Sequence, residues 1–194
     1  MKREQLLEAV RGQMTKHRYE HTLGVMETAV RLAEKYGADK TKAETAAILH
    51  DYCKFWSEEN MRKIIETTPH IPKDLLEHDK ELWHAHVGAE AVRRDLGIED
   101  EEILNAIRYH TSGRENMTLL EKVVCLADYI EPGRQFPGVE ELRQVAEEDL
   151  DRALAKALGG TIAFLVNREK RIYPLTVLAR NSLIKSKKNN KQEE

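Results

Sequence analysis

Residues 39–51 read DKTKAETAAILHD, and this stretch decides the fold class. Asp39 is a residue type that caps helices, and Ala43, two further alanines and His50 follow it at the three- and four-residue spacing of one helical face. The segment therefore predicts an amphipathic helix. The helix ends in two adjacent side chains that can bind a metal ion, His50 and Asp51.

The same periodicity extends in both directions along the chain. Only 10 glycines and 5 prolines occur, and runs of β-branched residues are scarce, which favours an all-α helical bundle. The segment 66–80 is expected to be an irregular surface connection, and the loop 131–138 is the richest in turn-forming residues. Besides the helix after Asp39, helices are predicted over 3–17, 18–36, 57–68, 82–95, 100–110, 117–130, 139–147, 149–167 and 175–184.

Composition limits the class of protein. The chain has 194 residues, of which 41% are hydrophobic and 34% charged, which suits one globular domain over residues 1–184. Residues 185–194 carry charges and no apolar side chain, and we expect a disordered tail. A net charge of −3 argues against a partner such as nucleic acid. No signal peptide or apolar run long enough to span a membrane is present, so we expect a cytoplasmic protein with no membrane contact.

Histidines and aspartates recur at inward positions of the predicted helices. These residues are His21, His50, His84, His110 and Asp128, each on the apolar stripe of a different helix. An unpaired polar group in a protein interior costs about 1–3 kcal/mol, so a shared divalent cation explains them better than five separate buried groups. Imidazole and carboxylate ligands without thiolate suit iron, manganese, cobalt, nickel or zinc. Asp51 can reach the ion beside His50 only near the helix end, and there its carboxylate can also bridge two ions.

Several short sequence motifs of the chain resemble those of a known family. His21, His50-Asp51 and Asp128 match the H…HD…D signature of the HD-domain metal-dependent phosphohydrolases. The chain more specifically resembles the YqeK family of HD-domain symmetrical bis(5'-nucleosyl)-tetraphosphatases, which hydrolyse diadenosine tetraphosphate, over about residues 2–183. The stretches that carry this resemblance are RYEHTLGV (18–25), AILHDYCK (47–54), LWHAHVGA (82–89), YHTSG (109–113), ADYIEPGR (127–134) and PLTVLARN (174–181).

The resemblance implies a role for each matching residue. The fold would be an HD-domain bundle, and the metal would be iron, held by His21, His50, Asp51 and Asp128. His84 and His110 would hold a second ion, with Asp51 as the bridge, or would face the substrate phosphates of a one-ion centre. The substrate would be a dinucleoside tetraphosphate and the product ADP, and a homodimer stays open.

Further residues follow the resemblance or the charge pattern. Lys54, three residues after Asp51, suits a catalytic cation that neutralises phosphate, and Arg134 could hold a phosphate through two hydrogen bonds. Beside the metal ligands, the expected nucleotide and phosphate contacts are His84, Tyr109, His110, Arg134, Arg171, Tyr173, Thr176 and Arg180. His86 is expected to be solvated or to lie just outside the ligand shell. Cys53 and Cys125 are expected to be buried thiols.

Other functions use the same ligands. The site could act on an alarmone, a deoxynucleotide or a cyclic dinucleotide, although the Gly-Tyr-Pro signature of the last branch is absent near residue 110. It could hold a di-iron oxygenase centre. It could also be a nucleotide sensor that binds ligand without catalysis.

Overall fold

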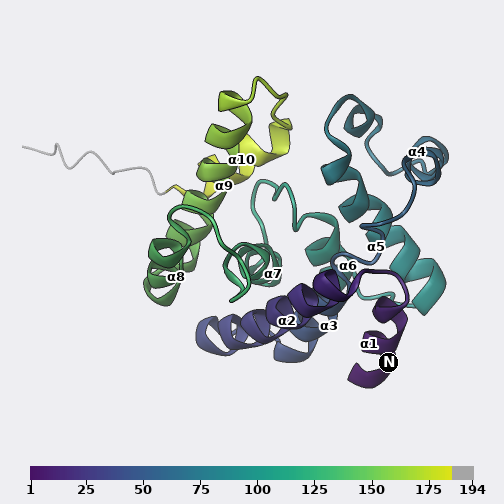
Figure 1. The fold of residues 1–194 in the computed structure, drawn as a ribbon, viewed down its shortest axis with the longest axis horizontal. Helices are drawn as coiled ribbons and strands as arrows, with labels where there is room; N and C mark the ends of the chain where they lie inside the picture. Colours follow the sequence, from purple (N-terminus) through teal and green to yellow (C-terminus); the bar gives the residue numbers. More distant parts are fainter. Residues whose placement is uncertain (185–194) are drawn as a thin grey trace, which may run out of the picture.

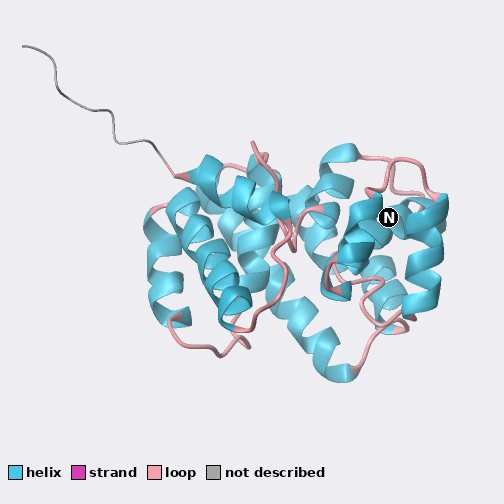
Figure 2. Ribbon diagram, turned by 90° about the horizontal axis from the view of Figure 1, so that it is seen from above, coloured by secondary structure: helices cyan, strands magenta, loops and turns pink. Residues whose placement is uncertain are grey.

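The computed structural model describes residues 1–184, and every regular element in that range is a helix (Figures 1 and 2). Two short 3₁₀ helices, η1 (Lys73–Glu77) and η2 (Lys80–Leu82), accompany the α-helices. The α-helices are α1 (Arg3–Arg11), α2 (Lys16–Tyr36), α3 (Lys40–Leu49), α4 (Glu58–Thr67), α5 (Trp83–Leu96), α6 (Glu101–Arg108), α7 (Leu119–Ile130), α8 (Val139–Glu148), α9 (Leu150–Asn167) and α10 (Pro174–Leu183). The all-α expectation is confirmed.

Helix α7 lies at the centre of the arrangement. It packs against α2 and α3 on one side and against α8 and α9 on another (Figure 1). Helices α8, α9 and α10 form a group at the left of that view, while α4 and α5 lie at the right. Because α2, α3, α5, α6 and α7 converge around one point, side chains from distant parts of the sequence meet there.

Local sequence explains most helix ends. Asp39 accepts hydrogen bonds from the backbone amides of Thr41 and Lys42, and Ser57 accepts one from Asn60, as their N-cap positions predict. Gly37 ends α2 in the left-handed conformation, with φ of 82°, which costs glycine little. Helix α3 ends at Leu49, so His50 and Asp51 lie in the first turn after it, where both side chains can turn inward.

Three sequence expectations need correction or comment. The helix predicted over 3–17 is shorter, because α1 ends at Arg11 and Thr15 caps α2, so the break between the first two helices comes before residue 16 and not after residue 17. The segment 66–80 is not purely a surface connection, since it forms η1 and buries Ile71 and Leu75 in the core. The tail predicted over 185–194 lies outside the described residues. Within residues 1–184, no helix combines the length and the hydropathy needed to cross a membrane.

Candidate metal centre

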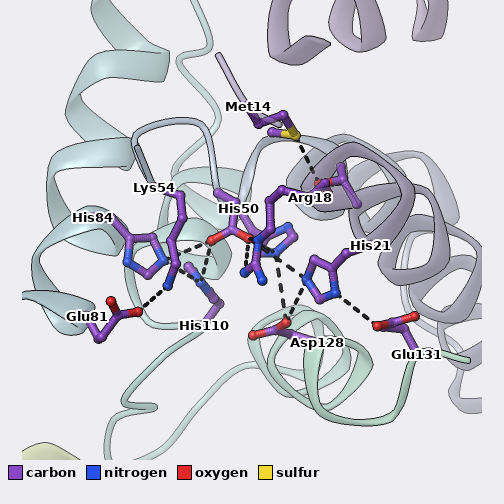
Figure 3. A network of polar contacts seen from close by, with 12 residues as sticks. Met14, Arg18, His21, His50, Lys54, Glu81, His84, His110, Asp128 and Glu131 are labelled. Carbon is purple, nitrogen blue, oxygen red and sulfur yellow. Dashed lines mark hydrogen bonds and ion pairs between the residues drawn. The ribbon is translucent and has the colours of Figure 1, made fainter. Parts of the chain in front are cut away.

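The predicted metal-binding residues meet in one buried cluster (Figure 3). His21 comes from α2, His50 and Asp51 from the turn after α3, His84 from α5, His110 from the turn after α6, and Asp128 from α7. The four histidines and Asp51 are each at least 93% buried. Five elements therefore contribute to one centre, as the inward-facing pattern predicts.

Asp51 has one carboxylate oxygen directed toward each of two histidine pairs. Its Oδ2 lies 2.9 Å from His50 Nε2 and 3.8 Å from His21 Nε2. Its Oδ1 lies 3.0 Å from His84 Nε2 and 4.0 Å from His110 Nε2. The carboxylate thus lies between two halves of the cluster, with one oxygen facing each half.

Asp128 completes the half that contains His21. Its Oδ1 lies 3.0 Å from His21 Nε2 and 4.0 Å from His50 Nε2. The other half contains two histidines whose Nε2 atoms are 3.2 Å apart. Two neutral imidazoles in this position need one donor and one acceptor, whereas a cation between them would bind both as acceptors.

The cluster fits a divalent cation on the chemistry of its unpaired atoms. His21 Nε2, His50 Nε2 and Asp51 Oδ1 are buried and have no hydrogen-bond partner. Each nevertheless has an imidazole nitrogen or a carboxylate oxygen of the cluster within 4 Å. Buried polar atoms of native proteins are nearly always paired, so atoms that face one another without a hydrogen bond indicate ligands of a common ion. All of them are nitrogen or carboxylate oxygen, which suits a borderline-to-hard divalent metal.

The protonation states suit the same role. Burial opposes the charge of Asp51, yet His50 and His84 hold the pKa of this carboxyl well below its usual value. Burial likewise opposes the charge of Asp128, but His21, Arg134 and His50 lower its pKa in turn. Burial lowers the pKa of His84, and burial with the neighbouring His50 and His84 lowers that of His110. Ionised carboxylates and neutral imidazoles are the forms that bind metal.

His50 is an exception to this trend. Burial alone would lower its pKa, but the adjacent Asp51 carboxylate outweighs burial and raises it. Its Nδ1 lies 2.6 Å from the carbonyl oxygen of Ala47, and that hydrogen bond leaves Nε2 directed at the cluster. His110 is held in the same way, with its Nδ1 2.8 Å from the carbonyl oxygen of Ile107.

Three charged residues near the cluster were not singled out by sequence reasoning. Arg18, one turn before His21 on α2, forms an ion pair with Asp51 Oδ2. Glu81 pairs with Lys54, its Oε2 2.5 Å from Nζ. Glu131, directly after α7, contacts His21. The position of Arg18 on the His21 face of α2 is a signal that periodicity offers, whereas Glu81 and Glu131 are brought in only by the tertiary fold.

A cavity of about 770 Å³ opens beside the cluster. His110 and Asp128 reach its wall, and the expected phosphate contacts Lys54, Arg134, Arg171, Tyr173 and Thr176 also line it. Arg134 is engaged with Asp128, donating to its backbone oxygen at 2.7 Å and pairing with its carboxylate. The other wall is one face of α9, formed by Ala157, Gly160, Thr161, Phe164 and Leu165.

Two of the predicted nucleotide contacts do not line this cavity. Tyr109 lies on a separate, smaller cavity with His70 and Arg108, and its ring packs beneath the Arg114 guanidinium. Arg180, on α10, donates to Asn181 and lies close to Gly159. Both residues lie in sequence stretches that resemble the family, but in the structure their side chains lie on other surfaces. Their assignment to nucleotide binding stays a prediction.

The structure excludes one of the two positions expected for His86, because this side chain is not solvated. It is 2% exposed, neither ring nitrogen has a hydrogen-bond partner, and the ring packs against Tyr109 at a centroid distance of 5.7 Å. Burial, with a smaller contribution from Arg108, lowers the pKa of His86 from 6.5 to about 3. The imidazole is therefore neutral in the folded protein. The buried, free thiols Cys53 and Cys125 agree with expectation.

Substituting His86 by Leu should weaken the acid sensitivity of the fold. Between about pH 6.5 and pH 3 the unfolded chain binds a proton that folded His86 excludes, so the free energy of unfolding falls as the pH falls, by up to about 1.4 kcal/mol per pH unit. His86→Leu removes this contribution. Urea unfolding of the chelator-treated protein at several pH values measures it, with His17→Leu, which alters an exposed histidine, as the control. Parallel pH profiles for wild type and His86→Leu would contradict the burial of a neutral imidazole.

The fold and the buried cluster define a class of protein. The HD domain family matches residues 18–133, a range that begins before His21 and ends after Asp128. A solved structure from Clostridium acetobutylicum, described as a "predicted HD superfamily hydrolase involved in NAD metabolism", has the same fold, with a TM-score of 0.90 and 40% identity. The match covers 94% of this chain and 97% of that one.

Similar chains narrow the class. A Bacillus subtilis protein named symmetrical bis(5'-nucleosyl)-tetraphosphatase is 54% identical over 95% of this chain and 98% of its own length. A protein of the same name from Halalkalibacterium halodurans is 51% identical over 97% of this chain and 100% of its own. The chain belongs to the HD domain family and, within it, to the YqeK family of symmetrical bis(5'-nucleosyl)-tetraphosphatases.

Proposed function

We propose that this protein hydrolyses diadenosine tetraphosphate symmetrically to two molecules of ADP. The observation that carries the proposal is that His110 and Asp128 of the His/Asp cluster line a cavity that also presents Lys54, Arg134 and Arg171. A polyphosphate is bound by cationic side chains, and a nucleoside is bound by apolar surface. The lining of this one cavity contains both kinds of side chain. The similarity to tetraphosphatases over nearly the whole chain supports this substrate class.

The ligand set that we propose has two parts. His21, His50, Asp128 and Asp51 Oδ2 would hold one ion, and His84, His110 and Asp51 Oδ1 would hold a second. A divalent cation there supplies charge neutralisation at the phosphoryl oxygens and lowers the pKa of water. We propose iron as the native metal, with manganese, cobalt, nickel and zinc as alternatives that the same donor atoms accept.

The residues of the chain then account for the remaining requirements of the reaction. Water adds to one of the two central phosphorus atoms, and the bond from that phosphorus to the bridging oxygen breaks, so each half leaves as ADP. Lys54 lies on the cavity wall, where its ammonium group can neutralise charge on the departing phosphate. Arg134, fixed by its hydrogen bonds to Asp128, presents a guanidinium beside the centre. Arg18 neutralises Asp51 from the α2 side.

The α9 wall suits a nucleoside at the end of the polyphosphate. Phe136 and Phe164 line the cavity and are 40% and 52% exposed, and aromatic rings in such a position can stack on a base. Gly160 also lines the cavity, and a Cβ atom there would meet nothing within 4 Å. A glycine in the interior of a helix lowers helix stability. Because Gly160 has no side chain, it lets a ligand approach the backbone of α9 closely, which can offset this cost.

A panel of substrates tests the proposal against its alternatives. With the metal-loaded protein, diadenosine tetraphosphate should be consumed faster than a guanosine tetraphosphate alarmone or a deoxynucleoside triphosphate, and without oxygen uptake. Preference for either competing nucleotide would support a different HD phosphohydrolase. Binding of ADP without turnover of any substrate would indicate a sensor and would contradict the proposal.

A further inference from the structure

Glu131 is a buried carboxylate outside the proposed ligand set. It follows the last residue of α7, is 3% exposed, and places Oε1 3.0 Å from His21 Nδ1 (Figure 3). An ionised carboxylate can only accept a hydrogen bond, so this contact requires the proton on Nδ1. The lone pair of His21 is then on Nε2, the nitrogen that faces Asp51 and Asp128.

The surroundings of Glu131 are built to hold it there. The backbone amide of Gly133 donates to its Oε2 at 2.5 Å. On the other side lies Gly24, one turn after His21 on α2, where a Cβ atom would be only 2.6 Å from the same oxygen. Real Cβ contacts are not that short, so a side chain at residue 24 would force the Glu131 carboxylate to shift from this position.

The loop that carries Glu131 is fixed from α8. The Arg143 guanidinium donates to three backbone carbonyl oxygens of this loop, those of Ile130 at 2.9 Å, Glu131 at 2.7 Å and Arg134 at 3.0 Å. Carbonyl groups at the end of a helix otherwise lack partners. One side chain therefore fixes the backbone of Glu131, the Gly133 amide holds its carboxylate, and Gly24 leaves the space that the carboxylate fills.

The group that contacts Nδ1 of His21 differs from the groups that contact Nδ1 of His50 and His110. The Nδ1 atoms of His50 and His110 lie against neutral backbone carbonyls, whereas that of His21 lies against a charged carboxylate. A carboxylate behind a ligating imidazole sets its tautomer and strengthens the opposite nitrogen as an electron-pair donor. We propose that Glu131 is a positioning residue that raises the affinity of the His21 half of the centre for a divalent cation.

The inference rests on the metal centre of the proposed function but not on its substrate, so binding of Co²⁺ tests it. The metal-free protein is titrated with Co²⁺ while its visible absorption is recorded. Glu131→Leu should weaken binding at the His21 half by about 10–100-fold, the usual effect of losing an outer-shell partner. Glu131→Gln should recover part of this loss, because an amide oxygen can still accept the Nδ1 proton. Nitrogen NMR of the His21 ring should show the Nδ1-protonated tautomer in wild type and its loss in Glu131→Leu.

Glu121, within α7 itself, offers a control. It is also fully buried, but it pairs with Arg114, with Nε–Oε2 and Nη2–Oε1 distances of 2.9 and 2.7 Å. Glu121→Gln should therefore leave Co²⁺ affinity unchanged. Equal weakening by Glu121→Gln and Glu131→Leu would overturn the inference, because general loosening of α7 would then explain both.

Gly24→Ala supplies an independent variant that leaves Glu131 in place. Alanine favours a helix more than glycine does, yet its Cβ should displace the carboxylate and weaken Co²⁺ binding as Glu131→Leu does. In the Glu131→Leu background, Gly24→Ala should cause no further loss. Additive losses, or full Co²⁺ affinity in both single variants, would overturn the inference. Failure of wild type to bind Co²⁺ would instead contradict the metal centre of the proposed function.

Discussion

Substituting Asp51 by Ala should empty the metal centre and abolish hydrolysis. Asp51 contributes one oxygen to each half of the cluster, so its loss removes a ligand from both proposed ions at once. Loss of an outer-shell partner alone weakens metal binding by about 10–100-fold, and loss of a shared ligand should exceed about 100-fold. Elemental analysis of the dialysed protein measures the metal, and consumption of diadenosine tetraphosphate measures the activity.

Controls must separate this effect from misfolding. The substitution also leaves Arg18 without its carboxylate partner, which can destabilise the fold. Asp51→Asn keeps the shape of the side chain and should show the same loss of metal with a thermal unfolding transition intact. Asp151→Ala removes a carboxylate that pairs with Lys122 at 2.8 Å on another part of the surface, and it should keep metal and activity. A folded Asp51→Ala protein with full metal content and activity would contradict the proposed centre.

Joint substitution of His84 and His110 by Ala should remove one of two ions. These histidines share Asp51 Oδ1, while His21, His50 and Asp128 surround Asp51 Oδ2. Metal content should therefore fall from about two ions to about one per chain, and hydrolysis should be lost, since each ion stabilises a different oxygen in two-metal hydrolysis. Elemental analysis of wild type and double variant in parallel measures the change.

The same experiment distinguishes the one-ion centre. In that arrangement His84 and His110 face the substrate phosphates. Wild type would then hold about one ion, and the double variant would keep it while losing substrate binding. Equal metal content in the two proteins would contradict the bridging role of Asp51.

Most of the fold could be predicted because its signals are local. Capping residues such as Asp39 and Ser57 and the stop at Gly37 act within a few residues, so they place helix ends from sequence alone. Two features of the fold were not predicted. The apolar stripe of residues 3–17 continues across the break between α1 and α2, and nothing in the polar segment 66–80 signals that Ile71 and Leu75 reach the core.

The centre could be predicted only in part, for a physical reason. Buried histidines and aspartates on apolar faces are unusual enough to be noticed one by one, and they do converge. Glu131 sits just past the end of its helix and meets His21 from 110 residues away, so only the packing of α7 against α2 brings the pair together. Tyr109 shows the reverse case, because its neighbour His110 turns into the centre while its own ring lies on another cavity.

The identity of the products tests the central claim most directly. The metal-loaded protein is incubated with diadenosine tetraphosphate in water enriched in oxygen-18, and the nucleotides are separated and weighed by mass spectrometry. Attack at a central phosphorus predicts ADP as the sole product, with one heavy oxygen in one of the two ADP molecules from each turnover, and no product from Asp51→Ala. Formation of ATP together with AMP, or turnover by Asp51→Ala at the wild-type rate, would contradict it.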